Sequence, residues 1–277
     1  MKISKVDFSS FKANGQAMFG NTDRMIWEKE YPSEHKGNCN WALRSLFIEH
    51  EDKKILIDSG FGNSNPDILD EYEVDAFQSS NEILNSLGKN PDEITHVLHT
   101  HLHIDHCGGS FIKNENHPII PSFKNATYYC GNLQLNKAKN PTHFEKDSFQ
   151  PEIISALFNH NNLELINNEC YIFSWLEFLL FNGHTNGMTL PIIHTPKFSL
   201  AFVGDLIPSI AHMRLQSTMS YDVNQVLSLS ERENFLEDAY ENEYVLFFQH
   251  DFYYECCTLK KEKSRILPAD IFKFSDL

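Results

Sequence analysis

The sequence predicts an α/β fold built in layers, with sheets covered by helices, and three observations support this prediction. Short apolar runs rich in Ile, Val, Phe and Tyr recur along the chain at the length of a strand. Segments with the apolar spacing of a helix lie between them. Several of the runs are followed directly by His or Asp, and strand-end loops commonly carry function in layered α/β folds.

The individual strands and helices follow from these patterns. The apolar runs expected to be strands span 45–50, 54–60, 95–100, 126–130, 163–166, 169–173, 176–181, 188–193, 200–205 and 244–250. The segments 75–88, 148–159 and 230–242 are expected to be helices. Gly88 is suited to end the first helix, and Ser230 with Glu233 would form a capping box in the third. Because no linker rich in Pro, Gly or Ser divides the chain, we expect a single domain over residues 1–277.

The charge of the chain restricts its partners. Among 277 residues, 38 are acidic and 23 are basic, which gives a formal net charge of −15. This balance argues against nucleic acid, because binding to a phosphate backbone depends mainly on Lys and Arg. We therefore expect a small-molecule substrate that is neutral or weakly charged.

Composition also bears on location and assembly. The N-terminal residues lack the apolar core of a signal peptide, and no apolar run approaches the roughly 18 residues of a membrane span. The six cysteines form no CxxC pair, which is typical of reduced thiols. These features predict a cytoplasmic protein that does not bind membranes, with a homodimer as a candidate assembly.

The stretch "HVLHTHLHIDH", residues 96 to 106, contains five of the chain's 14 histidines. His101 and His103 are two residues apart, a spacing that places both rings on one side of an extended chain. Asp105 and His106 are adjacent and point in different directions. One pair can therefore bind one metal ion while the other pair reaches a second ion. The alternative is that these are exposed loop histidines, but the combined H-x-H-x-D-H pattern favours ligands.

Three later strands also deliver polar residues into loops. His184 follows the expected strand 176–181 in "GHT", Asp205 lies in "GD" at the end of 200–205, and His250 lies in "HD" at the end of 244–250. Imidazole and carboxylate are the ligands of zinc, and also of iron, manganese and cobalt. Two such ions roughly 3.5–4 Å apart form the clamp found in many hydrolases.

Taken together, "HTHLHIDHCGG", "GHT", "GD" and the late "HD" resemble the metallo-β-lactamase superfamily, in the same order and over nearly the whole chain. The resemblance implies a four-layer αβ/βα sandwich holding two divalent metal ions, with zinc expected first and manganese, iron or cobalt as alternatives. The ligands that it implies are His101, His103 and His184 for the first ion, Asp105, His106 and His250 for the second, and Asp205 as the bridge. His96 and His99 match no ligand position.

Within the superfamily, "AMFG" with Trp27, "GDLIPSIAH", "SYD" and "FFQHD" resemble the branch of acyl-homoserine lactonases and methyl parathion hydrolase-like enzymes. The resemblance implies a hydrolase in which a hydroxide held between two metal ions attacks a lactone or related ester. Asp105 would orient that hydroxide and protonate the leaving alkoxide. A phosphotriester hydrolase and a glyoxalase-type thioesterase are the alternatives. No cluster of Lys and Arg suited to the carboxylates of glutathione supports the thioesterase.

The sequence departs from the pattern of this branch at one position. Lactonases of this branch place a Tyr three residues after the bridging Asp, and this chain has Pro208 there. The nearest polar candidate for the tyrosine's role is His212, which would point back toward the metals if the loop begins a helical turn. The alternative is that His212 only packs. Asp58 is expected to support the metal loop by accepting a hydrogen bond from a ligand histidine, and Asp251 to make local hydrogen bonds.

Overall fold

The computed structural model describes residues 1–63, 66–75, 78–113 and 119–277, and the chain divides into two compact units. Unit 1 consists of Met1–Ser10, Leu43–Asn167 and Gly187–Thr189, and unit 2 of Phe11–Ala42, Asn168–Asn186 and Leu190–Leu277. Each unit is thus assembled from segments that are distant in sequence. The expectation of a single domain over 1–277 stays a prediction.

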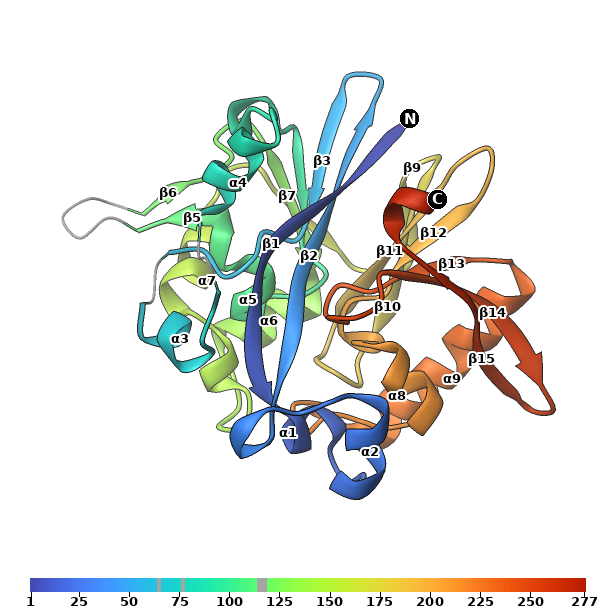
Figure 1. The fold of residues 1–277 in the computed structure, drawn as a ribbon. Coiled ribbons are helices and arrows are strands. Elements are labelled where there is room, and N and C mark those ends of the chain that lie inside the picture. Colours follow the sequence, from blue (N-terminus) through green and yellow to red (C-terminus); the bar gives the residue numbers. More distant parts are fainter. Residues whose placement is uncertain (64–65, 76–77, 114–118) are drawn as a thin grey trace. The chain divides into compact units, whose positions relative to one another are not determined.

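A six-stranded sheet, most of which lies in unit 1, has the order β1-β2-β3-β4-β7-β8. Its strands are β1 (Lys2–Asn14), β2 (Asn38–His50), β3 (Lys53–Ile57), β4 (His96–Leu98), β7 (Thr127–Gly131) and β8 (Leu163–Ile166). The short strands β5 (Phe111–Ile112) and β6 (Ile120–Pro121) pair with each other. The helices of the unit are α3 (Pro66–Glu71), α4 (Ser80–Ser86), α5 (Ile104–Cys107), α6 (Asn132–Lys139) and α7 (Pro151–Phe158). Helix α6 packs on β7 and α7 (Figure 1).

The direction of the central strands positions the loops that matter for function. β3, β4, β7 and β8 run parallel to one another, and the apolar residues of β3 and β4 are fully buried. The carboxyl ends of parallel strands lie at one edge of a sheet. The residue after β3, Asp58, therefore lies beside the loop after β4, and its backbone N–H donates to the carbonyl of Leu98 at 2.8 Å.

A seven-stranded sheet has the order β15-β14-β13-β12-β11-β10-β9, and nearly all of it lies in unit 2. Its strands are β9 (Cys170–Phe173), β10 (Leu176–Phe181), β11 (Met188–His194), β12 (Ser199–Phe202), β13 (Val245–Phe247), β14 (Cys256–Glu262) and β15 (Arg265–Phe272). β12 and β13 are parallel, so the loops that carry Asp205 and His250 leave the sheet at the same edge.

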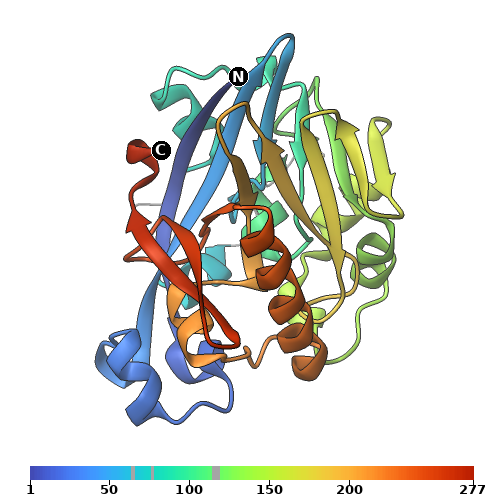
Figure 2. The ribbon, with the colours of Figure 1, turned by 90° about the vertical axis from the view of Figure 1, so that its right-hand side faces the viewer.

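The helices of unit 2 are α1 (Gly15–Phe19), α2 (Arg24–Glu30), α8 (Ile210–Leu215) and α9 (Gln225–Glu241). α8 packs against β15. α9 packs against β14 and β15, and Figure 2 shows it in orange alongside the sheet. Within the described ranges, no helix is long and apolar enough to span a bilayer.

The prediction of mixed strands and helices is confirmed, and each expected strand overlaps an observed one. The helices at 75–88 and 148–159 are present as α4 and α7, although residues 76 and 77 lie outside the described part of the chain. The capping box at Ser230 is wrong. Helix α9 begins five residues earlier, at Gln225, and its N-cap residue is Asn224, whose side chain accepts from the N–H of Leu227. The sequence patterns missed β1, β5, β6, β14 and β15.

Candidate metal centre

Unit 1 carries four of the predicted ligands on one loop and one short helix. His101 lies in the loop after β4, and His103 is the N-cap residue of α5. Nε2 of His101 lies 3.1 Å from Nδ1 of His103, and their rings meet edge to face with centroids 4.5 Å apart. The two-residue spacing thus brings a nitrogen of each ring to one point, as the sequence predicts.

His106 is oriented by a buried carboxylate on the neighbouring strand. Oδ2 of Asp58 lies 2.8 Å from Nδ1 of His106, and a carboxylate can only accept, so Nδ1 carries the proton. Asp58 also accepts from the N–H and the hydroxyl of Thr100, each at 2.8 Å. Nε2 of His106 is thereby left with its lone pair, 3.3 Å from Oδ2 of Asp105. Asp58 makes the supporting contact expected of it.

The other three predicted ligands lie together in unit 2. Oδ2 of Asp205 is 3.2 Å from Nε2 of His184, and Oδ1 of Asp205 is 3.0 Å from Nε2 of His250. Asp205 lies in a 3₁₀ turn, Gly204–Leu206, directly after β12. One carboxylate therefore faces two histidines, one oxygen to each.

Both of these histidines are fixed by acceptors at their other nitrogen. Nδ1 of His184 lies 2.9 Å from Oδ1 of Asp222, and Nδ1 of His250 lies 3.0 Å from the carbonyl of Ala42. Since both partners only accept, each Nδ1 carries the proton and each Nε2 presents a lone pair to Asp205. A lone pair and a carboxylate oxygen at such distances repel each other unless a proton or a metal cation lies between them. The donor set therefore fits a divalent metal ion such as zinc.

The loop that holds His184 is secured by α9. The carboxylate of Glu231 accepts from the N–H groups of Asn182 and Gly183, at distances from 2.8 to 3.1 Å. A Cβ on Gly183 would lie 2.2 Å from the nitrogen of Ser228, so the residue before His184 has to be glycine. The loop that carries His184 therefore packs closely against α9 at Gly183.

Asp251 makes the expected local hydrogen bonds through Oδ1, and a bond to a distant residue through Oδ2. Its Oδ2 accepts from the N–H of Ile210 at the start of α8, and its Oδ1 accepts from those of Tyr253 and Tyr254. The residue after His250 thus ties that segment to the helix that follows Asp205.

Asp222 is the supporting residue that sequence reasoning missed. It occurs in the "SYD" string, but nothing in the local pattern shows that it faces His184, which lies 38 residues earlier. Its second oxygen accepts from the N–H of Met219 at 2.9 Å. The only sequence signal for Asp222 was an acidic residue shortly before the start of α9. Glu145, another buried carboxylate, lies 3.9 Å from Nε2 of His103 and was also missed.

The predicted donor His212 is in α8 and has no exposed surface. Its Nε2 lies 2.8 Å from the carbonyl of Met18, so Nε2 carries the proton, and its Nδ1 accepts from the hydroxyl of Ser209 at 2.8 Å. The ring stacks on Phe19 with centroids 4.7 Å apart. Burial lowers the pKa of His212 to about 3, so the ring is neutral. Both nitrogens are engaged within unit 2, which favours the packing alternative over a donor to substrate.

We expect His212→Ala to affect stability more than turnover. The change would leave the Met18 carbonyl and the Ser209 hydroxyl without a buried partner and open a void beside Phe19, and should lower the free energy of unfolding by about 2–4 kcal/mol. Turnover per folded molecule should stay within about twofold. Denaturant unfolding and steady-state kinetics on the same preparation measure both. A stable variant with intact metal content and strongly reduced turnover would restore the donor role.

Residues 44–250 match the model of the metallo-beta-lactamase superfamily, and the chain belongs to this superfamily. The fold is the metallo-β-lactamase fold with mixed α/β sheets, and the expectation of a metal-dependent hydrolase is confirmed at the level of the superfamily.

Relatives with a narrower description are distant. An N-acyl homoserine lactonase of Bacillus thuringiensis is 21% identical over 249 residues, which cover 84% of this chain and 88% of the relative. A probable metal-dependent hydrolase from Staphylococcus aureus has a similar structure, with a TM-score of 0.85, 22% identity and 98% of each chain covered. A dizinc quorum-quenching lactonase with a bound product has a TM-score of 0.79 at 18% identity, covering 98% of this chain and 95% of its own.

Proposed function

We propose that the protein is a dinuclear, zinc-dependent hydrolase that acts on a lactone or a related ester. We assign His101 and His103 of unit 1 and His184 of unit 2 to the first ion, Asp105 and His106 of unit 1 and His250 of unit 2 to the second ion, and Asp205 of unit 2 to the bridge. The observation that carries this assignment is the Asp205 carboxylate between two histidines whose protons are held elsewhere.

Two divalent ions bound there would supply Lewis-acid activation of the substrate carbonyl and of water. The contribution of the chain is to hold its donors in place before substrate arrives. Asp58, Asp222 and the Ala42 carbonyl fix the tautomers of three ligand histidines, so no ring has to rotate or exchange a proton. Preorganised donors of this kind lower the cost of reaching the transition state.

Asp105 is the residue to which we assign proton transfer. Its side chain is 19% exposed, whereas that of Asp205 is 12% exposed. The side chains of the ligand histidines His103, His106, His184 and His250 are at most 8% exposed. A carboxylate with this access can take a proton from water and pass it from its oxygen to the leaving alkoxide. Nε2 of His106 lies 3.3 Å from Oδ2 of Asp105, so a metal ion bound by both residues would hold this carboxylate in position.

The charge of the chain and its relatives support a small, uncharged ester as the substrate. The net charge of −15 disfavours anionic polymers. The distant curated relatives are N-acyl homoserine lactonases, and two similar solved structures hold N-hexanoyl-homoserine as a product. We further propose that the protein acts in the cytoplasm on a small molecule, with a homodimer as the candidate assembly.

We expect close to two zinc ions per chain in protein purified without added metal, because seven donor groups exceed what one tetrahedral ion binds. Elemental analysis of the purified protein measures this content, and dialysis against a chelator provides the metal-free reference. A content that stays at one ion after zinc is added back would contradict the dinuclear assignment.

A substrate panel on the zinc-loaded protein tests the reaction class. It contains an acyl-homoserine lactone, an aryl ester, a thioester and a phosphotriester of similar size. We expect the lactone to have the highest kcat/KM, and the chelator-treated protein to lose the activity. A preference for the thioester or the triester by more than about tenfold would replace the lactonase with that alternative.

A further inference from the structure

Arg232, on α9, is a buried cation that holds two loops of unit 2. It is 1% exposed. Its Nε donates to the carbonyl of Leu206 at 2.8 Å, and its Nη1 donates to the carbonyl of Ser217. A buried guanidinium is costly unless its hydrogen bonds achieve something that an apolar side chain cannot. The role of Arg232 therefore depends on which functional residues lie in the segments that contain these two carbonyls.

Both carbonyls belong to segments that carry the candidate metal centre. Leu206 is the residue directly after Asp205, in the same 3₁₀ turn. Ser217 precedes the turn that ends at Asp222, where the N–H of Met219 donates to the Asp222 carboxylate. That carboxylate accepts from Nδ1 of His184. One rigid side chain thus joins the turn of Asp205 to the turn that orients His184.

The charge of Arg232 acts on the same group. Burial lowers the pKa of Arg232 to about 10, and the charges of Asp222 and Glu233 oppose this effect. Asp222 is itself buried, and an anion in that position is stabilised by a cation nearby. Nη2 of Arg232 has no hydrogen-bond partner among the described residues. The guanidinium therefore acts on the ligand turns through its hydrogen bonds to the two carbonyls and through the electrostatic attraction of its positive charge for Asp222.

We propose that Arg232 is a positioning residue for the metal ligands: it sets the place of Asp205 through Leu206 and the tautomer of His184 through Asp222. This role depends on the proposed function, because it concerns the ligands of the metal ions. It adds to that function a residue of α9 that contacts neither substrate nor ligand.

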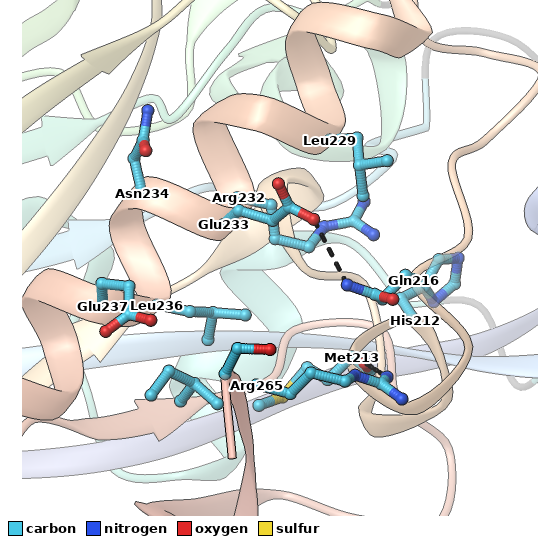
Figure 3. Close-up of a pocket in the computed structure, with 12 residues that line it drawn as sticks. His212, Met213, Gln216, Leu229, Arg232, Glu233, Asn234, Leu236, Glu237 and Arg265 are labelled. Atoms are coloured by element: carbon cyan, nitrogen blue, oxygen red, sulfur yellow. Dashed lines mark hydrogen bonds between the residues drawn. The ribbon is translucent and has the colours of Figure 1, made fainter. Parts of the chain in front are cut away.

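The surroundings of Arg232 provide a matched control. It lines a pocket of about 450 Å³ between α8, α9 and the β14–β15 hairpin, together with Arg265 (Figure 3). Arg265 also donates to two carbonyls, those of Met213 and Arg214, at 3.5 and 2.7 Å. These residues are in α8, and neither carbonyl belongs to the turn of Asp205 or to that of Asp222. Arg265 is exposed, so Arg265→Met removes a guanidinium with two carbonyl contacts from the same pocket, outside the ligand turns.

The first readout is zinc affinity. We expect Arg232→Met to raise the zinc dissociation constant by roughly 10–100-fold, as is usual when a residue that orients a ligand is lost. Arg232→Lys keeps the charge but reaches only one carbonyl, so we expect an intermediate loss of about tenfold. Arg265→Met should stay within about twofold of wild type. Circular dichroism establishes that each variant is folded, and the Lys variant decides the outcome if the Met variant does not fold.

The second readout needs no metal. Nitrogen-15 NMR of the metal-free protein reports which ring nitrogen of His184 is protonated. We expect a single tautomer with the proton on Nδ1 in wild type and in Arg265→Met, and a mixture in the Arg232 variants. Wild-type protein that binds no zinc would refute the proposed function, while the tautomer would still decide the role of Arg232. A folded Arg232 variant with the wild-type tautomer and a dissociation constant within twofold would overturn the inference.

Discussion

Asp205→Asn is expected to lose one of the two metal ions and to reduce kcat by about 10³-fold or more, the largest effect that we expect from any single substitution. The amide keeps one oxygen, which can face only one of His184 and His250. Its NH₂ group faces the other ring and donates to the Nε2 lone pair, which that ring then cannot offer to a metal ion. Metal analysis and kinetics on the same preparation measure both consequences.

Asp251→Asn is the matched control for this substitution. Asp251 follows a predicted ligand directly, and its oxygens accept from the backbone N–H groups of Ile210, Tyr253 and Tyr254. We expect the variant to keep two ions and to lose about 1 kcal/mol of unfolding free energy, as when the cap of a helix is weakened. Equal metal loss in the two variants would mean that Asp205 acts on the fold and not as a ligand.

Asp105→Asn is expected to reduce the turnover of a lactone by about 10²–10⁴-fold with only moderate loss of metal. The amide retains one oxygen for coordination but cannot carry a proton from water to the leaving alkoxide. The loss should be smaller for an aryl ester, whose leaving group departs without protonation. A series of esters with leaving groups of different pKa measures this difference.

Two other outcomes would assign Asp105 differently. An equal loss for all leaving groups, together with reduced metal content, would make Asp105 a ligand only. Near-full activity with the lactone would assign proton transfer to another residue.

The sequence alone predicted the chemistry of the site, because the donors lie in short local strings. His101, His103, Asp105 and His106 fall within six residues, and the two-residue spacing of His101 and His103 by itself predicted that their rings lie on one side of the chain. The α/β class followed from the alternation of apolar runs with helical segments, since burial imposes a period on each element. The start of α9 was misplaced because a Ser three residues before a Glu occurs inside helices as well as at their ends.

The supporting contacts were decided only by the tertiary structure. Nδ1 of His184 donates to a residue 38 positions away, His250 to one 208 positions away, and His212 to one 194 positions away. Hydrogen bonds between distant segments leave no periodic trace in the sequence, because each end is one ordinary residue in its own neighbourhood. The local string shows only that His212 follows Asp205. The tertiary structure shows that its two nitrogens bond to Met18 and Ser209, and these contacts favour packing over catalysis.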